Sequence, residues 1–169
     1  MKAKSIKGNS PAEIKAALAQ SMADGFNPTL AIVFISILMD VRGTMAVLEE
    51  AGLAIFGAST AGEFTDSGIA HHSAAILLLD IPATYFHITL SAYNRGEEKE
   101  TARHIGEEGK KAFRHPAVMM VTSHLETPGE YVMEGLTDAL GPDVTIIGGV
   151  AGDDLLMQGG IVFTNHTSS

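Results

Sequence analysis

Apolar residues at the start of the chain form first a helical stripe and then a short continuous run. Ile14, Leu18 and Met22 recur every four residues in an otherwise polar and Ala-rich segment, which is typical of an amphipathic helix. Ser10 precedes this segment as an N-cap candidate. The following run, residues 30–37, is continuously apolar and too short to cross a bilayer. The pattern therefore predicts a capped helix followed by a buried strand.

The same alternation continues through the middle of the chain. A helix is expected from about Val41 to Ala51, followed by a short strand from Leu53 to Phe56. Two further apolar runs, Ser73–Asp80 and Ala83–Tyr93, indicate strands, and only a short link separates them. Such a link predicts that the two strands are antiparallel neighbours in a sheet.

The order of elements then starts again. Residues 97–113 carry the mixed charges of a solvated helix, residues 117–123 form an apolar run, and a further helix leads to a short strand at 144–149. The two halves align at an offset of about 90 residues, with Gly57 on Gly148. The chain therefore has the pattern of a duplicated α/β unit.

This self-similarity predicts the fold class and the domain organisation. We expect an α/β fold with a mixed β-sheet and flanking helices, built from two pseudo-repeats of a helix-strand-helix-strand-loop-strand unit. A single domain would span residues 1–169, with a first repeat at about 10–93 and an incomplete second repeat at about 97–169. Because the second repeat ends one strand early, we expect an uncovered edge near Ile161–Phe163. Formation of a homo-oligomer would cover that edge.

A glycine-rich loop follows the second strand of each half. The first loop has the glycine spacing of a phosphate-binding loop, but Glu63 stands where that motif has lysine. Ligands collect at the carboxyl ends of strands in α/β sheets, and glycine lets the backbone approach them closely. The expected ligand-binding residues are Gly57, Ser59, Thr60, Gly62, Glu63, Gly148, Gly149, Gly152, Asp153 and Asp154.

Charge narrows the class of ligand. The chain has 20 acidic and 11 basic residues, a net charge of -9, so its field would repel nucleic acid. The carboxylates of Glu63, Asp153 and Asp154 would attract an amine, while loop N–H groups would bind an anionic group of the same molecule. An amino acid or another small amine fits both requirements. The alternative is that the loops are turns whose glycines serve backbone geometry alone.

Composition restricts the chemistry further. The chain has no cysteine, which removes thiolate metal sites and disulfides and leaves the cytoplasm as the default location. No membrane-spanning run is present, and no apolar segment of an export signal follows the basic start. No metal site is expected, because the adjacent His71 and His72 lack the spacing of a zinc-binding pair.

Two alternatives involve catalysis or a cofactor. Ser59 lies in a sequence close to the G-x-S-x-G nucleophile elbow, but the second glycine comes one residue late. A small hydrolase or transferase using Ser59 or Thr60 is therefore the alternative to a binding protein, although we expect no catalytic residue. A third reading is a haem-based nitric oxide sensor, for which His87 and His124 are the candidate ligands. No cofactor is otherwise expected.

The two loops also resemble those of a known family. The segments IFGASTAGEF and IIGGVAGDD are similar to the signature loops of the FIST domain, named for F-box and intracellular signal transduction proteins. The resemblance extends from about Leu30 to Asn165. It implies a ligand-sensing input domain, mostly bacterial and cytoplasmic, that binds small molecules such as amino acids. It also implies histidine kinases or cyclic-dinucleotide signalling enzymes as partners, and some members are linked to haem and nitric oxide sensing.

The chain departs from the family pattern at three points. Ala58 stands where many members have cysteine, and Val150 stands where a small or hydroxylated residue is commoner. The family also continues into a C-terminal part, whereas this chain stops soon after its second loop. The resemblance therefore concerns the N-terminal part of the family, and we expect that part of a composite pocket lies outside this chain.

Overall fold

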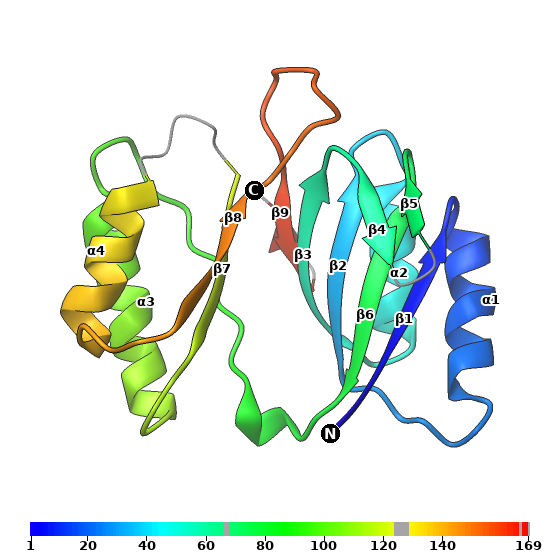
Figure 1. Cartoon of the computed structure of the whole chain (residues 1–169), viewed down its shortest axis with the longest axis horizontal. Helices are drawn as coiled ribbons and strands as arrows, with labels where there is room; N and C mark the ends of the chain where they lie inside the picture. The colour runs from blue at the N-terminus through cyan, green and yellow to red at the C-terminus, as the bar shows by residue number, and fades with distance from the viewer. Residues whose placement is uncertain (66–67, 124–128, 166, 169) are drawn as a thin grey trace.

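The computed structural model of the chain describes residues 1–65, 68–123, 129–165 and 167–168. A large α/β body and a smaller α/β unit lie on either side of a central connecting segment (Figure 1). No helix among the described residues is long and apolar enough to cross a membrane. In chain order the elements are β1 (Lys2–Gly8), α1 (Pro11–Met22), β2 (Leu30–Ser36), α2 (Val41–Glu50), β3 (Ala54–Thr60), β4 (Glu63–Thr65), β5 (Gly68–Ala70), β6 (Ala74–Asp80), the 3-10 helix η1 (Ala83–Tyr85), α3 (Glu98–Ala112), β7 (Val118–Thr122), α4 (Gly129–Leu140), β8 (Ile146–Val150), β9 (Val162–Thr164) and β10 (Thr167–Ser168).

The large body is built on a six-stranded sheet in the order β1–β6–β2–β3–β9–β10. β2 and β3 are parallel, from Leu30 opposite Ala54 to Ser36 opposite Thr60, because the helix α2 connects them as a crossover. The other neighbours are antiparallel, including β6 with β2 and β3 with β9. The sheet is therefore mixed, as the sequence predicts.

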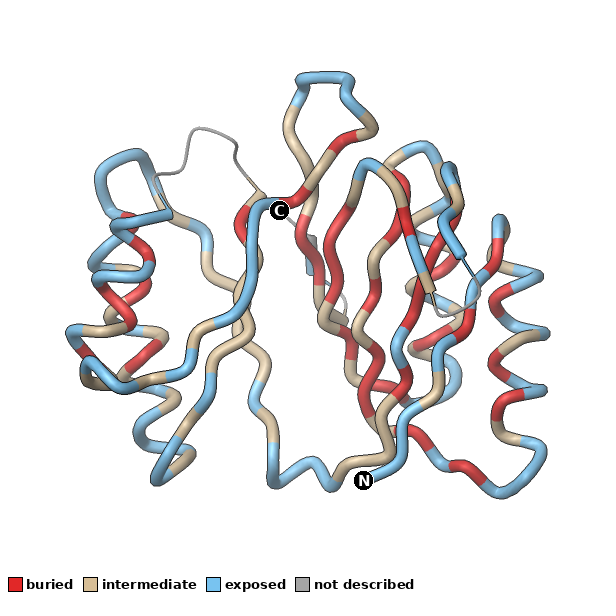
Figure 2. Tube along the Cα trace, in the orientation of Figure 1, coloured by how far each residue is buried: buried red, intermediate tan, exposed pale blue. Residues whose placement is uncertain are grey.

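Helices α1 and α2 pack against this sheet and close the largest hydrophobic core. Ser10 caps α1 as predicted, because its Oγ accepts a hydrogen bond from the Glu13 N–H at 3.3 Å. Asp40 caps α2 in the same way, accepting from the Gly43 N–H at 2.8 Å. The buried strands of this body contrast with the more exposed smaller unit (Figure 2). Core residues include Ile14, Leu18, Val33, Ile35, Leu48, Ile55 and Ile76.

The smaller unit consists of α3, α4 and the parallel pair β7–β8. Its helices approach closely at two glycines. A Cβ added at Gly135 would lie 2.1 Å from the carbonyl oxygen of Lys99, and one at Gly106 would lie 2.7 Å from the Cβ of Ala139. The small core beneath them contains Ala102, Val132 and Leu136. Small residues therefore allow this unit to form a core separate from that of the large sheet.

The two parallel strand pairs have the same register. Val33 lies opposite Gly57 in β2–β3, and Met120 lies opposite Gly148 in β7–β8. The surroundings differ, since β2–β3 is part of six strands and β7–β8 stands as a separate two-stranded sheet. The α/β fold class is confirmed. The internal repeat stays a prediction, which the shared register supports.

Two strand assignments differ from the sequence prediction. Ala83–Tyr93 is not a strand, because it begins with η1 and continues without ladder pairing. Its expected pairing with Ser73–Asp80 is therefore wrong, and β6 lies between β1 and β2 instead. The apolar pattern also fails to predict β1, an edge strand in which only Ile6 and Gly8 are buried.

The exposed apolar edge also lies elsewhere than expected. Ile161–Phe163 is largely covered, because Val162 and Phe163 are buried and β9 pairs with β3. In β8, by contrast, Ile147 keeps 58 % of its surface and Val150 is also exposed, as the pale blue tube of β8 shows (Figure 2). The prediction of an uncovered edge at 161–163 is therefore wrong.

Candidate functional site

The two glycine-rich loops meet in the folded chain. The Gly152 N–H donates a hydrogen bond to the Ser59 carbonyl oxygen at 2.8 Å. The Ser59 hydroxyl donates to the Gly152 carbonyl oxygen at 2.6 Å and accepts from the Ile161 N–H at 2.8 Å. We call this contact between residues 57–63 and 151–154 the loop junction. The structure thus brings together most of the residues that the sequence predicts for a site.

Close packing explains the glycines of the loop junction. A Cβ added at Gly57 would lie 2.1 Å from Cε2 of Phe163, whose ring packs on the glycine. A Cβ at Gly152 would lie 2.9 Å from the backbone nitrogen of Ala61. These glycines are therefore required by contacts within the chain, whether or not a ligand binds beside them.

The other predicted glycines have different surroundings. Gly148 lies in β8 with a φ of 153°, and a Cβ there would lie 1.8 Å from the carbonyl oxygen of Met120. Gly149 follows it on the exposed face of β8, and Gly62 forms the turn between β3 and β4 with a φ of 137°. Gly148 and Gly149 thus belong to the smaller strand pair. In the chain they precede residues 151–154, the second segment of the loop junction.

The carboxylate of Glu63 is buried and bound by its own chain. Only 2 % of the residue is exposed. One oxygen accepts from the Thr60 hydroxyl at 2.7 Å, and the other accepts from the Ser73 hydroxyl at 2.9 Å and the Ser73 N–H at 3.2 Å. Glu63 therefore fastens the turn after β3 to the start of β6.

Both aspartates of the second loop also have partners. The N–H groups of Gln158 and Gly159 donate to Asp153 at 2.6 and 3.0 Å, and these bonds, the Gln158 one foremost, lower the pKa of Asp153 against the opposing effect of desolvation. Asp154 accepts from the Ser36 hydroxyl at 2.6 Å and from the Ile37 N–H at 3.1 Å. It therefore ties the second loop to the carboxyl end of β2.

The loop junction is thus held by hydrogen bonds within the chain. A ligand that used the hydroxyl of Ser59 would have to replace one of these bonds, whereas the carboxylates of Asp153 and Asp154 each accept the hydrogen bonds given above at one oxygen. The Ser59 hydroxyl is fully buried and bonded to two backbone groups, which gives no support to a nucleophilic role. The ligand-binding role of the ten loop residues stays a prediction.

A cavity of about 240 Å³ lies next to the loop junction, and the sequence does not predict it. Its walls come from both parts of the molecule: Phe56 and Val162 belong to the large sheet, and the strand residues Val118–Thr122 belong to the smaller unit. Residues 89–93 of the connecting segment and the first turns of α3 complete the wall. We call this space the Glu98 cavity. Its polar lining residues are Thr89, Ser91, Tyr93, Glu98, Thr101, Thr122 and Ser123.

Glu98 is the charged residue in the wall of this cavity. It is the first residue of α3 and only 5 % exposed. The backbone N–H of Gly96, foremost, lowers the pKa of the Glu98 carboxyl, and the charge of Arg95 adds a smaller effect in the same direction. The side chain is therefore ionised at neutral pH, in a place where an ionised group is costly to bury without partners.

The connecting segment supplies unused backbone groups. Residues 86–92 run between the two parts of the molecule, and none of the hydrogen bonds between described residues involves their backbone N–H or C=O groups. Half-buried extended backbone is normally paired. Residues 89–92 line the Glu98 cavity, so donors and acceptors are available at its wall.

A second cavity of about 430 Å³ continues from the first along the connecting segment and shares Phe56, Thr89 and Ile105 with it. His87 and His115 line this second space. His87 is exposed, and no group of three potential metal ligands occurs among the described residues. His124, the other candidate haem ligand, lies outside the described residues.

Comparison with known families agrees with the fold and the two loops. The FIST N domain matches residues 29–169, which include the loop junction and the Glu98 cavity. No curated protein and no solved structure matches the chain. The family is consistent with a sensory domain of signal transduction. Since the match extends over far more than half of its length, the chain belongs to the FIST N domain family.

Proposed function

We propose that this chain is a small-molecule-binding sensory domain of bacterial signal transduction, and that its ligand is an amino acid or another small amine. One observation carries the proposal: the Glu98 cavity is lined by the large sheet on one side and by the smaller unit on the other. Ligand pockets occur preferentially at such boundaries, with mainly apolar walls and a few polar groups. The loop junction, by comparison, has its polar groups already engaged.

The position of the cavity supports a sensory role. A ligand there would contact both parts of the molecule, and it would favour the relative arrangement in which both sets of contacts are made. The direct links between the two parts include the short bonds of Gly152 to Ser59 and of Asp154 to Ser36. Ligand binding would therefore add contacts across this boundary. The signalling partner would be a histidine kinase or a cyclic-dinucleotide enzyme that reads this arrangement.

Thermal unfolding in the presence of small molecules tests the proposal. A ligand at one hundred times its dissociation constant should stabilise the fold by about 2.7 kcal/mol, which is roughly 5–10 °C for a chain of this size. The screen should contain amino acids, amines, carboxylic acids and neutral apolar compounds. If no compound in any class raises the unfolding temperature, the proposal of a small-molecule sensor is wrong.

A pair of matched variants places the ligand. Thr101 lines the Glu98 cavity, whereas Thr137 is a half-buried threonine of α4 outside it. Thr101→Phe should abolish the ligand-induced shift because the ring fills the cavity, and Thr137→Phe should retain it. An undiminished shift in Thr101→Phe would place the ligand elsewhere.

A further inference from the structure

Backbone groups of Gly96 and of Glu98 itself bind the Glu98 carboxylate, but no described cation lies within salt-bridge distance of it. Of the neighbouring cations, Lys99 is engaged elsewhere, 3.1 Å from Glu134 and 3.0 Å from Asp138. Arg95 acts on Glu98 through its charge but forms no salt bridge with it. An ionised carboxylate in the wall of a cavity is a site at which a cation from outside would be bound.

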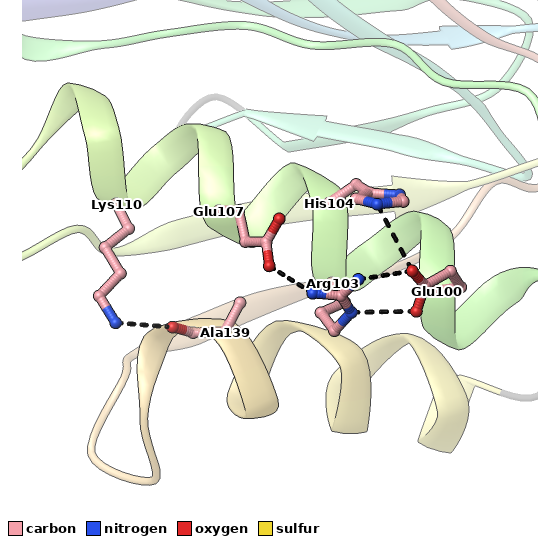
Figure 3. A network of polar contacts seen from close by, with 6 residues as sticks. All are labelled: Glu100, Arg103, His104, Glu107, Lys110 and Ala139. Carbon is pink, nitrogen blue, oxygen red and sulfur yellow. Dashed lines mark hydrogen bonds and ion pairs between the residues drawn. The ribbon is translucent and has the colours of Figure 1, made fainter.

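Two further cations of α3 are engaged with other groups. Arg103 forms ion pairs with Glu100 and Glu107 on its own helix, and the Lys110 ammonium donates to the Ala139 carbonyl oxygen at 3.3 Å (Figure 3). These contacts lie along the α3–α4 side of the helix. The counter-ion of Glu98 is therefore not supplied by α3 itself.

The rest of the cavity wall selects the body of the ligand. Hydrophobic side chains such as Leu90, Ile105 and Val162 alternate with hydroxyls such as Thr101 around the space. A volume of about 240 Å³ corresponds to about eight water molecules at roughly 30 Å³ each. The cavity thus has room for a small apolar group together with one charged end.

We propose that the Glu98 cavity binds a protonated primary amine carried on a small apolar body, with Glu98 as its counter-ion. This rests on the proposed function and assigns the ligand to a site other than the loop junction. The amine donates to the Glu98 carboxylate, and the apolar body lies against the hydrophobic side chains. Where the molecule also has a carboxylate, it is bound by the N–H groups of residues 89–92, which make no hydrogen bond to another described residue. The shared chemistry is the amine, which a simple alkylamine and an amino acid both possess.

Three related probes distinguish a simple alkylamine from an amino acid as the ligand. Isoamylamine has the amine and side chain of leucine without its carboxylate, and 4-methylpentanoic acid has the side chain and carboxylate without the amine. Leucine has all three. We expect leucine or isoamylamine to raise the unfolding temperature, whereas 4-methylpentanoic acid does not. Binding of isoamylamine as tightly as leucine would identify an amine site, and tighter binding of leucine an amino-acid site.

A conservative variant with a matched control tests the role of Glu98. Glu98→Gln should weaken binding of the amine at least tenfold, since a charged hydrogen bond becomes a neutral one. Glu97→Gln is the control, because Glu97 caps the preceding turn through Asn94 and is exposed. It should leave the dissociation constant unchanged.

The outcomes separate this inference from the proposed function. The inference is wrong if neither leucine nor isoamylamine binds, or if Glu98→Gln lowers the unfolding temperature of the free protein while the dissociation constant stays the same. Suppose the inference is wrong but a carboxylic acid or a neutral compound still binds, and Thr101→Phe abolishes that binding. The proposal of a small-molecule sensor then stands. If no compound of the larger screen binds, both are wrong.

Discussion

The loop junction and the Glu98 cavity each contain a buried glutamate, but the two glutamates are in opposite situations. Glu63 accepts hydrogen bonds from Thr60 and Ser73 within its own chain. Glu98 lies at the wall of an open space and has no salt-bridge partner among the described residues. The comparison teaches that a glycine-rich loop with carboxylates can serve to join two parts of a fold. The connecting segment beside it, residues 89–92, has backbone groups that make no hydrogen bond to other described residues.

The largest effect is expected from filling the loop junction. Gly57→Ala would place a methyl group within the ring of Phe163, and overpacking of this kind costs about 3 kcal/mol. Gly109→Ala is the matched control, because no atom lies within 4 Å of a Cβ added there. In an α-helix that change should instead stabilise by up to ~1 kcal/mol. Urea unfolding of both variants measures the difference, and equal stabilities would show that the junction is not tightly packed.

Glu63→Gln should affect stability and leave ligand binding intact. Both the N–H and the hydroxyl of Ser73 donate to one oxygen of Glu63, and an amide offers only one acceptor oxygen for three donors. We expect a loss of about 2 kcal/mol, or roughly 4–8 °C in the unfolding temperature. The ligand-induced shift should stay as large as in the unmodified chain, which is the reverse of the result for Glu98→Gln. If Glu63→Gln kept the normal unfolding temperature but lost the ligand-induced shift, the ligand would bind at the loop junction.

The smallest expected effect is on the stability of the fold at low pH. Because the pKa of Asp153 is lowered in the folded chain, this carboxylate contributes stability above its unfolded pKa of about 4 and loses that contribution as the pH falls further. Asp153→Asn should therefore be less stable than the unmodified chain at pH 7, and the difference should shrink toward pH 3. Urea unfolding at several pH values measures it. A difference that grows toward low pH would contradict the assignment.

Local signals in the sequence predict the helices of this fold better than its strands. Ser10 caps its helix as expected because capping depends on neighbouring residues. The segment 83–93 has the alternation of a strand, but a strand also needs a partner, and pairing depends on residues far away in the chain. β1 is missed because only Ile6 and Gly8 of this strand are buried, so its sequence has no apolar pattern, and its pairing is with the distant strand β6.

The candidate site shows the same limit. Glycine spacing identifies the loops, yet it does not reveal that Gly152 and Ser59 would bond to each other. Glu98 stands in a charged run that predicts a solvated helix face. One signal was present: the buried positions of α3 recur every four residues at Glu98, Ala102 and Gly106. Ala102 and Gly106 are small residues on one face of α3, and Glu98 lies on the same face one turn earlier.

Amide hydrogen exchange with and without a bound amine tests most directly whether the ligand lies in the Glu98 cavity. In the free protein, the amides of residues 89–92 should exchange rapidly, because no hydrogen bond between described residues protects them. The amides of Ser59 and Gly152 should exchange slowly, because Ser59 donates to the Ile161 carbonyl oxygen and Gly152 donates to the Ser59 carbonyl oxygen. On saturation with leucine or isoamylamine, we predict that the amides at 89–92 become at least tenfold slower while Ser59 and Gly152 do not change. Protection that increases at the loop junction and not at 89–92 would contradict this placement.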